Sequence, residues 1–200
     1  MNFKLIVISS PSSEPNETEA IISLFKAGLK IFHLRKPAMS EKKMNSFVSA
    51  VPKKYHSRMI IHSHYSLAKK YDLGGIHFSE KERNKNSERF NGKSTSTGFH
   101  FPFDVLCFAG YDSVFLSPVF DSISKRGYKG AIALNKINIL IRNFKAHKGN
   151  KPALIALGGI SEKNVLKIRN AGFDGAAFLG AIWLSKDPVK SFLRIRSKII

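Results

Sequence analysis

Residues 153–181 read ALIALGGISEKNVLKIRNAGFDGAAFLGA, and this stretch carries the pattern that decides the fold. A short apolar run, Ala153–Leu157, precedes two glycines and a polar segment with apolar residues at helical spacing. A second apolar run, Gly175–Leu179, ends at another glycine. Short buried strands that alternate with amphipathic helices are typical of parallel βαβ units. The stretch therefore predicts two parallel strands joined by a helix over Glu162–Ala171.

The same alternation continues toward the N-terminus and predicts eight strands in all. Each predicted strand is a short run rich in apolar and β-branched residues, except the fifth, which is polar. The predicted strands are Phe3–Ser9, Lys30–Arg35, Arg58–His62, Gly75–Phe78, Lys93–Gly98, Ser113–Ser117, Ala153–Leu157 and Gly175–Leu179.

Amphipathic segments separate these strands and predict the intervening helices. Gly28 is expected to stop the first helix, and Ser40 and Ser161 are expected to act as N-caps. The predicted helices are Glu14–Gly28, a run from Ser40 to Val51, Ser66–Lys70, Asp104–Gly110, Leu134–His147, Glu162–Ala171 and Asp187–Lys198, whereas Glu80–Phe90 is expected to be a loop or a short helix.

About eight β/α units within 200 residues predict a single (β/α)8 TIM barrel that occupies residues 1–200. A doubly wound sheet is the alternative, but such sheets usually have about five or six strands. The chain has no linker rich in Pro, Gly and Ser and no low-complexity tract, so a second domain is not expected.

The formal net charge of +19, from 33 Lys and Arg against 14 Asp and Glu, favours anionic partners such as phosphate and diphosphate. A solvated, lysine-rich surface is the simpler explanation of the charge. Only this charge would suggest a nucleic-acid-binding protein. Arginine-rich arms, zinc-binding spacing and RNA-binding motifs are absent, so no nucleic-acid partner is expected.

The cysteine content and the apolar runs indicate the compartment. The single cysteine, Cys107, rules out an internal disulfide and fits a reducing cytoplasm, which is the expected location. The N-terminal apolar run is too short for a signal peptide. No apolar run approaches the roughly 20 residues that span a bilayer, so no membrane association is expected.

Active sites of such barrels lie at the C-terminal ends of the strands, so the residues that follow each strand are the site candidates. His33 and Arg35 are two residues apart at the end of the second strand, and both are expected to point toward the barrel mouth. Arg35 can hold a phosphate with its planar set of donors. Pairing with a neighbouring carboxylate is the alternative for Arg35.

Histidines stand at the ends of the next three strands. His62, His64 and His77 could form a metal site, because imidazole suits zinc and iron. Polar lining of the barrel mouth is the favoured interpretation of these three residues. His100 is a candidate proton carrier near neutral pH, with packing or simple hydrogen bonding as its alternative.

The loops after the last three strands contain candidates for anion binding. The loop from Ser117 to Gly130 contains Ser122, Ser124 and Lys125, which suit an anion, although an ordinary exposed loop is the alternative. The turns after the seventh and eighth strands are glycine-rich, and glycine lets backbone N–H groups approach a phosphate closely. The barrel fold often places a phosphate site there, and the residues concerned are Gly158, Gly159, Leu179 and Gly180.

Taken in order, these segments resemble the thiamine phosphate synthase family, including its thiazole tautomerase branch. The resemblance covers nearly the whole chain. The segments that carry it are Phe32-His33-Leu34-Arg35-Lys36, Met59-Ile60-Ile61-His62, Gly75-Ile76-His77-Phe78, Ser117-Pro118-Val119-Phe120, Ser122-Ile123-Ser124-Lys125, Ala156-Leu157-Gly158-Gly159-Ile160, Asp174-Gly175-Ala176-Ala177 and Gly180-Ala181-Ile182.

The resemblance implies an enzyme that joins an aminopyrimidine diphosphate to a thiazole phosphate and releases diphosphate. Arg35 and Lys125 would hold the diphosphate, with Mg²⁺ neutralising its charge. Ser122 and Ser124 match hydroxyl positions beside the thiazole. The backbones of Gly158, Gly159, Leu179 and Gly180 would hold the thiazole phosphate. A homodimer is compatible with this assignment.

The chain departs from the family pattern at the diphosphate end. The family usually reads Gln-Leu-Arg-Glu-Lys where this chain has His33-Leu34-Arg35-Lys36-Pro37, and Asn-Asp where it has His62-Ser63. Its aspartate after the fourth strand falls on Glu82, a candidate magnesium ligand. Gly98 replaces a serine.

These departures favour a thiazole tautomerase or an altered substrate. The tautomerase would need no metal, act on a carboxylated thiazole phosphate and use His100 as its acid and base. A non-catalytic binder of thiazole or thiamine phosphate is a further alternative.

Overall fold

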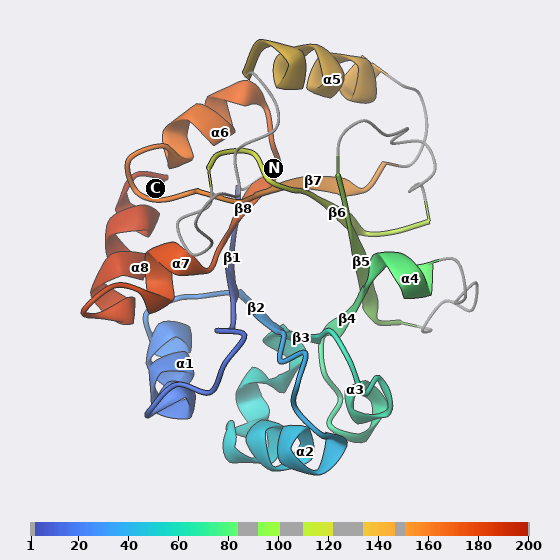
Figure 1. The fold of residues 1–200 in the computed structure, drawn as a ribbon, viewed down its shortest axis with the longest axis vertical. Helices are drawn as coiled ribbons and strands as arrows, with labels where there is room; N and C mark the ends of the chain where they lie inside the picture. Colours follow the sequence, from blue (N-terminus) through green and yellow to red (C-terminus); the bar gives the residue numbers. More distant parts are fainter. Residues whose placement is uncertain (1–2, 84–91, 101–109, 122–133, 147–150, 200) are drawn as a thin grey trace.

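The computed structural model of the chain describes residues 3–83, 92–100, 110–121, 134–146 and 151–199. Within these residues, eight parallel strands close into a barrel in chain order, from β1 to β8. Figure 1 shows the strands as a ring with the larger helices outside it. The predicted (β/α)8 barrel is therefore confirmed.

Each bound of the eight strands lies within one residue of its prediction. Pairing between β1 and β8 closes the barrel, with Lys4 opposite Gly175 and Val7 opposite Phe178. The strands are β1 (Lys4–Ile8), β2 (Ile31–Leu34), β3 (Met59–Ile61), β4 (Gly75–Phe78), β5 (Ser94–Phe99), β6 (Ser113–Leu116), β7 (Ala153–Leu157) and β8 (Gly175–Phe178).

Helices connect the strands and cover the outside of the barrel (Figure 1). The α-helices are α1 (Glu17–Lys26), α2 (Glu41–Ala50), α3 (Ser66–Lys70), α4 (Glu80–Arg83), α5 (Leu134–Ala146), α6 (Val165–Ala171), α7 (Gly180–Trp183) and α8 (Pro188–Ser197), and a 3-10 helix, η1, spans Lys53–Arg58.

Alternation along the strands divides the apolar side chains into two layers. On β1, Val7 packs in the larger cluster, which also contains helix residues such as Leu24 and Ile195. Ile6 and Ile8 point the other way and join a small cluster inside the barrel with Phe115, Ile155 and Ala177. The barrel interior is therefore filled below the C-terminal ends of the strands.

The polar fifth strand is confirmed, and its hydroxyls explain how it is buried. Ser96 and Thr97 are 3% and 0% exposed. Thr97 Oγ1 donates to the carbonyl of Phe78 at 3.0 Å, and Ser96 Oγ lies 2.9 Å from His77 Nδ1. Buried hydroxyls with such partners avoid the cost of an unmade hydrogen bond.

Two helix starts differ from the prediction. The first helix begins at Glu17 rather than Glu14, because Asn16 adopts a left-handed backbone with φ 54°. The helix predicted from Glu162 begins at Val165, and its N-cap is Asn164, so the assignment of Ser161 as N-cap was wrong. The Ser161 carbonyl accepts from Val165 N within a turn that precedes the helix. Ser40 caps α2 as predicted, by accepting a hydrogen bond from Lys43 N.

Two short helices were not predicted, namely η1 and α7. Each is too short to show helical periodicity in sequence. The region predicted as loop or short helix begins with α4, whereas its residues after Arg83 lie outside the described residues. The helix predicted over Asp104–Gly110 also lies outside them, except at Gly110. Among the described helices, none combines the length and apolarity needed to cross a membrane.

Candidate active site

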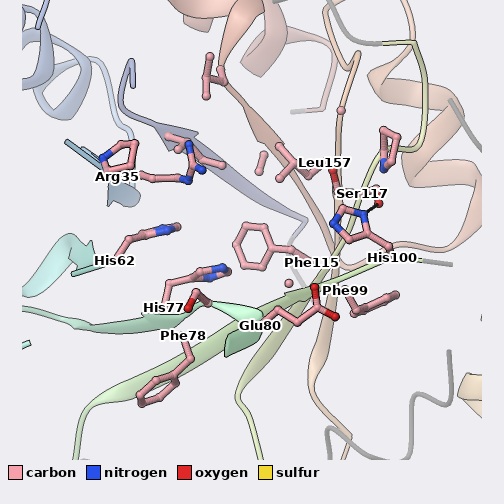
Figure 2. Close-up of a pocket in the computed structure, with 18 of the residues that line it drawn as sticks. Arg35, His62, His77, Phe78, Glu80, Phe99, His100, Phe115, Ser117 and Leu157 are labelled. Atoms are coloured by element: carbon pink, nitrogen blue, oxygen red, sulfur yellow. Dashed lines mark hydrogen bonds between the residues drawn. The ribbon is translucent and has the colours of Figure 1, made fainter. Parts of the chain in front are cut away.

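A cavity of about 510 Å³ opens at the C-terminal end of the barrel. Its wall combines basic and aromatic side chains with the glycine turns, and residues from the ends of most strands contribute. Figure 2 shows Arg35, His62 and His77 on one side of the cavity and His100 and Ser117 on the other. The remaining lining residues are Ile8, Lys36, Pro37, Ser63, Phe78, Ser79, Glu80, Gly98, Phe99, Phe115, Pro118, Leu157, Gly158, Gly159, Ile160, Ala177, Leu179 and Gly180.

Arg35 is the cation on the β2 side of the cavity. Its backbone is fixed to β1, because Arg35 N donates to Ser9 Oγ at 2.8 Å and Ser9 Oγ donates to Arg35 O at 2.9 Å. Its side chain is exposed. Within the described part of the chain, no carboxylate forms an ion pair with Arg35. The guanidinium is therefore available to an anionic ligand.

The neighbouring lysine, Lys36, forms a buried ion pair instead of offering its charge to a ligand. Lys36 Nζ is 2.5 Å from Glu17 Oε2 and 2.5 Å from the carbonyl of Ser12, and both ionic side chains are almost fully buried. The pair connects the end of β2 to helix α1. Burial is the main cause that raises the pKa of the Glu17 carboxyl, although Lys36 acts in the opposite direction. Lys36 thus has a structural role that its sequence position beside Arg35 did not reveal.

Three histidines meet at the base of the cavity, from the ends of β2, β3 and β4. His33 Nδ1 is 3.0 Å from His62 Nε2. The rings of His62 and His77 stack with centroids 4.1 Å apart and planes at 18°. One ring nitrogen from each of the three residues lies within 4.8 Å of the others. The prediction had grouped His64 instead of His33 with His62 and His77.

His64 points elsewhere because its backbone is left-handed, with φ 52°. Its Nε2 lies 2.9 Å from the carbonyl oxygen of Met39, in the loop that precedes α2. The grouping of His64 with His62 and His77 was therefore wrong.

The three clustered imidazoles are neutral at physiological pH. Burial is the largest cause that lowers the pKa of His33 and His62 well below the ordinary value, and His77 adds to the effect on both. Burial, with a smaller effect of Arg35, lowers the pKa of His77 to about 3. His33 is only 2% exposed. His62 and His77 are partly exposed at the cavity wall, so solvent moderates the effect of burial on them.

His100 lies on the opposite wall with one nitrogen committed to the backbone. Its Nδ1 is 2.6 Å from the carbonyl oxygen of Ser117. A carbonyl only accepts, so Nδ1 carries the proton and Nε2 of the neutral ring presents a lone pair. This arrangement leaves Nε2 as a base on an exposed side chain.

The turn after β7 requires glycine, because the segment after β6 packs directly against it. Gly158 and Gly159 have φ of 102° and 64°. A Cβ on Gly159 would lie 2.2 Å from the carbonyl oxygen of Asp121, and one on Gly158 would lie 2.9 Å from Pro118 Cα. The turn after β8 begins at Leu179 and Gly180, the latter being the first residue of α7. All four predicted phosphate-binding residues line the cavity, and they are Gly158, Gly159, Leu179 and Gly180.

Glu82 and Glu80 differ in their relation to the cavity. Glu82 Oε2 accepts from Tyr65 Oη at 2.7 Å and from Ser79 Oγ at 2.6 Å, and Glu82 is not among the lining residues. Glu80 does line the cavity, where it also pairs with Arg83 at 3.0 Å. The sequence had singled out Glu82 and missed Glu80, because their order along a single helical turn does not reveal which one faces inward.

Three predicted site residues lie outside the described residues, namely Ser122, Ser124 and Lys125. The neighbouring segment is described as far as Asp121 and packs along the end of β7. Val119 N donates to Leu157 O at 2.9 Å, and Phe120 N donates to Gly158 O at 3.2 Å. These bonds bring the start of the loop after β6 to the glycine turn.

Comparisons with known proteins agree on one family. The sequence profile described as thiamine monophosphate synthase matches residues 5–182. A thiamine-phosphate synthase of Leuconostoc citreum is 27% identical over 86% of this chain and 84% of its own. One from Oceanobacillus iheyensis is 27% identical over 90% of this chain and 89% of its own.

Solved structures of two thiamine phosphate pyrophosphorylases are also similar to this chain. A thiamine phosphate pyrophosphorylase from Bacteroides thetaiotaomicron superimposes with a TM-score of 0.77 at 28% identity and covers 98% of this chain and 96% of its own. One from Pyrococcus furiosus gives a TM-score of 0.78 at 17% identity, with 98% and 95% covered, and this likeness shows the fold alone.

Proposed function

The chain belongs to the thiamine monophosphate synthase family, and on this premise we propose that it joins an aminopyrimidine diphosphate to a thiazole phosphate. The products are thiamine phosphate and diphosphate. The observation that carries the proposal is the extent of the family match, from residue 5 in β1 to residue 182 in α7. All eight strands, and so every element at the cavity, fall in or border that range.

The reaction needs charge stabilisation on its leaving group. The bond between the pyrimidine methylene carbon and the diphosphate oxygen breaks, and the electron pair leaves with the diphosphate. The thiazole nitrogen then forms the new bond to the methylene carbon. Arg35 would bind the diphosphate, because its guanidinium lines the cavity and a planar fork of donors suits phosphate oxygens. Lys125 is proposed as the second cation on the diphosphate.

The thiazole phosphate would occupy the opposite side of the cavity. Gly158, Gly159 and Gly180 carry no side chain, so a phosphate can approach their backbone N–H groups closely. Their turns follow β7 and β8, where (β/α)8 barrels often bind phosphate. Ser122 and Ser124 are proposed to contact the thiazole. The two substrates would then meet between Arg35 and the glycine turns.

Magnesium is implied by the family, and one cavity group fits it. Mg²⁺ is usually held by one or two carboxylates together with substrate phosphates. Glu80 is the only carboxylate among the described residues that line the cavity, so Glu80 would hold Mg²⁺. Bound there, the ion would neutralise charge on the diphosphate. Glu82 would first have to release Tyr65 and Ser79.

A thiazole tautomerase is the second candidate function, and the geometry of His100 favours it. Within residues 3–83, 92–100, 110–121, 134–146 and 151–199, the hydrogen bond of His100 is the one from Nδ1 to the Ser117 carbonyl, so Nε2 could accept and return a proton at the cavity. A tautomerase of this kind would act on a carboxylated thiazole phosphate and would need no metal.

A turnover assay tests the proposal directly. Purified protein would be mixed with aminopyrimidine diphosphate, thiazole phosphate and Mg²⁺, and thiamine phosphate would be followed by the fluorescence of its oxidised form. We expect product at a rate that falls when Arg35 is changed to Ala. Arg142→Ala is the matched control, because Arg142 lies exposed on α5 and does not line the cavity.

The outcomes separate the candidate functions. Product formation with wild-type protein would support the synthase. Absence of product while thiazole phosphate still binds would contradict the synthase and favour the tautomerase or a non-catalytic binder. Proton exchange on the thiazole would then distinguish these two.

A further inference from the structure

The three histidines at the base of the cavity form the most unusual group of side chains at the site. His33, His62 and His77 come from the ends of adjacent strands β2, β3 and β4. Figure 2 shows the side chains of His62 and His77 lying next to each other and reaching into the cavity. The backbone of each is held in or next to the barrel sheet, so the three imidazoles are carried by a rigid frame.

The nitrogen atoms lie close enough together to reach one metal ion once the rings rotate. Zinc binds imidazole nitrogen at about 2.0–2.1 Å, so two ligands of a tetrahedral ion lie roughly 3.3 Å apart. His33 Nδ1 and His62 Nε2 are 3.0 Å apart. No pair among the three ligand atoms exceeds 4.8 Å. Binding all three to one ion requires rotation of the imidazoles, because the rings of His62 and His77 are stacked in nearly parallel planes.

His77 is already oriented by a hydrogen bond outside the cluster. Ser96 Oγ donates to the carbonyl of Ile76 at 3.4 Å, so it accepts the proton of His77 Nδ1 at 2.9 Å. The lone pair of His77 therefore lies on Nε2. Metal-binding histidines commonly donate their second ring N–H in this way, which fixes the tautomer and the ring orientation.

The space beside His77 Nε2 is kept open by a glycine. A Cβ on Gly98 would lie 3.8 Å from His77 Nε2, and Gly98 itself lines the cavity. A longer side chain at position 98 would extend toward this nitrogen. His62 and His77 also line the cavity. An ion bound by the three imidazoles would thus keep one coordination position that faces the cavity.

We propose that His33, His62 and His77 bind a divalent transition-metal ion of the zinc type, with its fourth position open to the cavity. Imidazole ligands suit zinc, cobalt and nickel better than magnesium, which prefers oxygen. Three protein ligands and one open position are typical of a catalytic rather than a structural site. The open position fits an anionic oxygen, because Arg35 lines the same cavity and its positive charge favours an anion beside the ion.

Ion binding needs a shift of protons but no net release. Each neutral imidazole has one N–H and one lone pair. The hydrogen bond between His33 and His62 is replaced by two bonds to the metal, and each ring keeps its proton on its other nitrogen. The proposal does not depend on the synthase reaction.

The test measures metal binding in the absence of substrate. Protein without an affinity tag is dialysed against a chelator, freed of the chelator and titrated with Co²⁺. Visible absorption bands and isothermal titration calorimetry are recorded. We expect one Co²⁺ per chain with the intense bands of four-coordinate cobalt, and displacement of cobalt by Zn²⁺. Loss of an outer partner of a metal ligand already weakens binding by about 10- to 100-fold, so His62→Gln and His77→Gln should each cost at least about tenfold.

His64→Gln is the matched control. It removes one imidazole only two residues from His62, yet its Nε2 contacts the Met39 carbonyl and not the cluster. This variant should keep the cobalt bands and the affinity unchanged. Ser96→Ala, which removes the partner of His77 Nδ1, should weaken binding while leaving one ion per chain.

Three results would overturn the proposal. They are the absence of cobalt bands and binding heat in wild-type protein, an equal loss in His64→Gln, and full binding in folded His62→Gln and His77→Gln. Circular dichroism establishes that each variant is folded. Should either variant unfold, His33→Gln replaces it, because this change removes the third ligand.

Discussion

Arg35 and His100 face each other across the cavity, and they are proposed to bind charge and to transfer a proton, respectively. Arg35 has a fixed backbone and an exposed guanidinium without a carboxylate partner in the described part of the chain. His100 has one nitrogen bound to the Ser117 carbonyl and one lone pair available. Substitution of each residue should therefore affect a different measurement.

Replacement of Arg35 should weaken binding of the diphosphate substrate. Hydrogen bonds to charged groups contribute about 1.5–3 kcal/mol, so Arg35→Ala should raise the Kd by about 10- to 100-fold. Arg35→Lys keeps the charge but loses the planar pair of donors. Its Kd should therefore lie between those of the wild-type protein and Arg35→Ala. Calorimetry with aminopyrimidine diphosphate measures the effect. An unchanged Kd in Arg35→Ala would remove Arg35 from the site.

Replacement of His100 should remove proton exchange without removing phosphate binding. In His100→Ala the base at the cavity is lost, whereas the glycine turns after β7 and β8 are untouched. Deuterium exchange on a carboxylated thiazole phosphate, followed by NMR, should stop while its Kd changes little. Full exchange in His100→Ala would refute the tautomerase mechanism, and His64→Ala is the control because His64 lies outside the cavity lining.

At the scale of the elements, two contacts between neighbouring β/α units fix the shape of the cavity. The segment after β6 packs against the glycine turn after β7. The end of β2 is joined to helix α1 by the buried Lys36–Glu17 pair. Both contacts hold backbone segments that line the cavity. Loss of either contact should therefore lower the stability of the protein and weaken ligand binding.

Substitution of Gly159 by Ala should destabilise the protein and weaken binding of thiazole phosphate. The residue has φ 64°, and the new Cβ would lie 2.2 Å from a backbone oxygen that cannot rotate away. A left-handed backbone alone costs a non-glycine residue about 1–2 kcal/mol, and the clash adds to it. Thermal unfolding and calorimetry measure both effects. Gly110→Ala is the control, because nothing lies within 4 Å of its Cβ position.

Removal of one member of the Lys36–Glu17 pair should be strongly destabilising. Lys36→Met leaves a buried carboxylate without its partner, which typically costs about 3–5 kcal/mol. The double variant Lys36→Met with Glu17→Leu removes both charges and should regain much of the loss. Urea unfolding of the two single variants and the double variant measures this coupling. Additive losses would show that the pair does not act as a unit.

At the scale of the whole molecule, the barrel interior changes from apolar to basic toward its open end. Ile6, Phe115 and Ile155 fill the interior, His33 is buried against Phe115 and His62, and the imidazoles of His62 and His77 line the cavity. Because these buried imidazoles are neutral in the folded protein, the free energy of unfolding should depend on pH in the acidic range. The net charge of +19 adds repulsion that acid would increase.

Global stability should fall as the pH decreases below about 6.5. The unfolded imidazoles bind protons near that pH, whereas the folded state resists protonation, since the pKa of His77 is lowered to about 3 and those of His33 and His62 are also lowered. Between these values the unfolded state holds more protons, so each imidazole removes up to about 1.4 kcal/mol per pH unit.

Urea unfolding of chelator-treated protein between pH 7 and 5 checks this expectation. Most carboxylates stay ionised in this range, so the slope reports on histidine. His77→Gln should flatten the dependence, whereas His64→Gln should not. A stability independent of pH between 6.5 and 5 would contradict the burial of neutral imidazoles.

The alternation of apolar runs and amphipathic segments in the sequence was sufficient to predict the barrel and its eight strands. Strand periodicity and glycine stops are local properties of the sequence. They were sufficient to predict both ends of β4 and of β7 correctly. The same pattern placed Arg35, His100 and the glycine turns at the mouth, because the C-terminal ends of parallel strands share one edge.

Only the tertiary structure decided which neighbouring side chains meet. His33 joins His62 and His77 while His64 turns away, because a positive φ at His64 breaks the alternation that the sequence alone would extend past β3. Glu80 faces the cavity and Glu82 does not. Lys36 is buried and pairs with the carboxylate of Glu17 on α1, which is 19 residues away in the sequence. These outcomes depend on backbone angles after the strands end and on long-range partners, neither of which a local pattern of residue types contains.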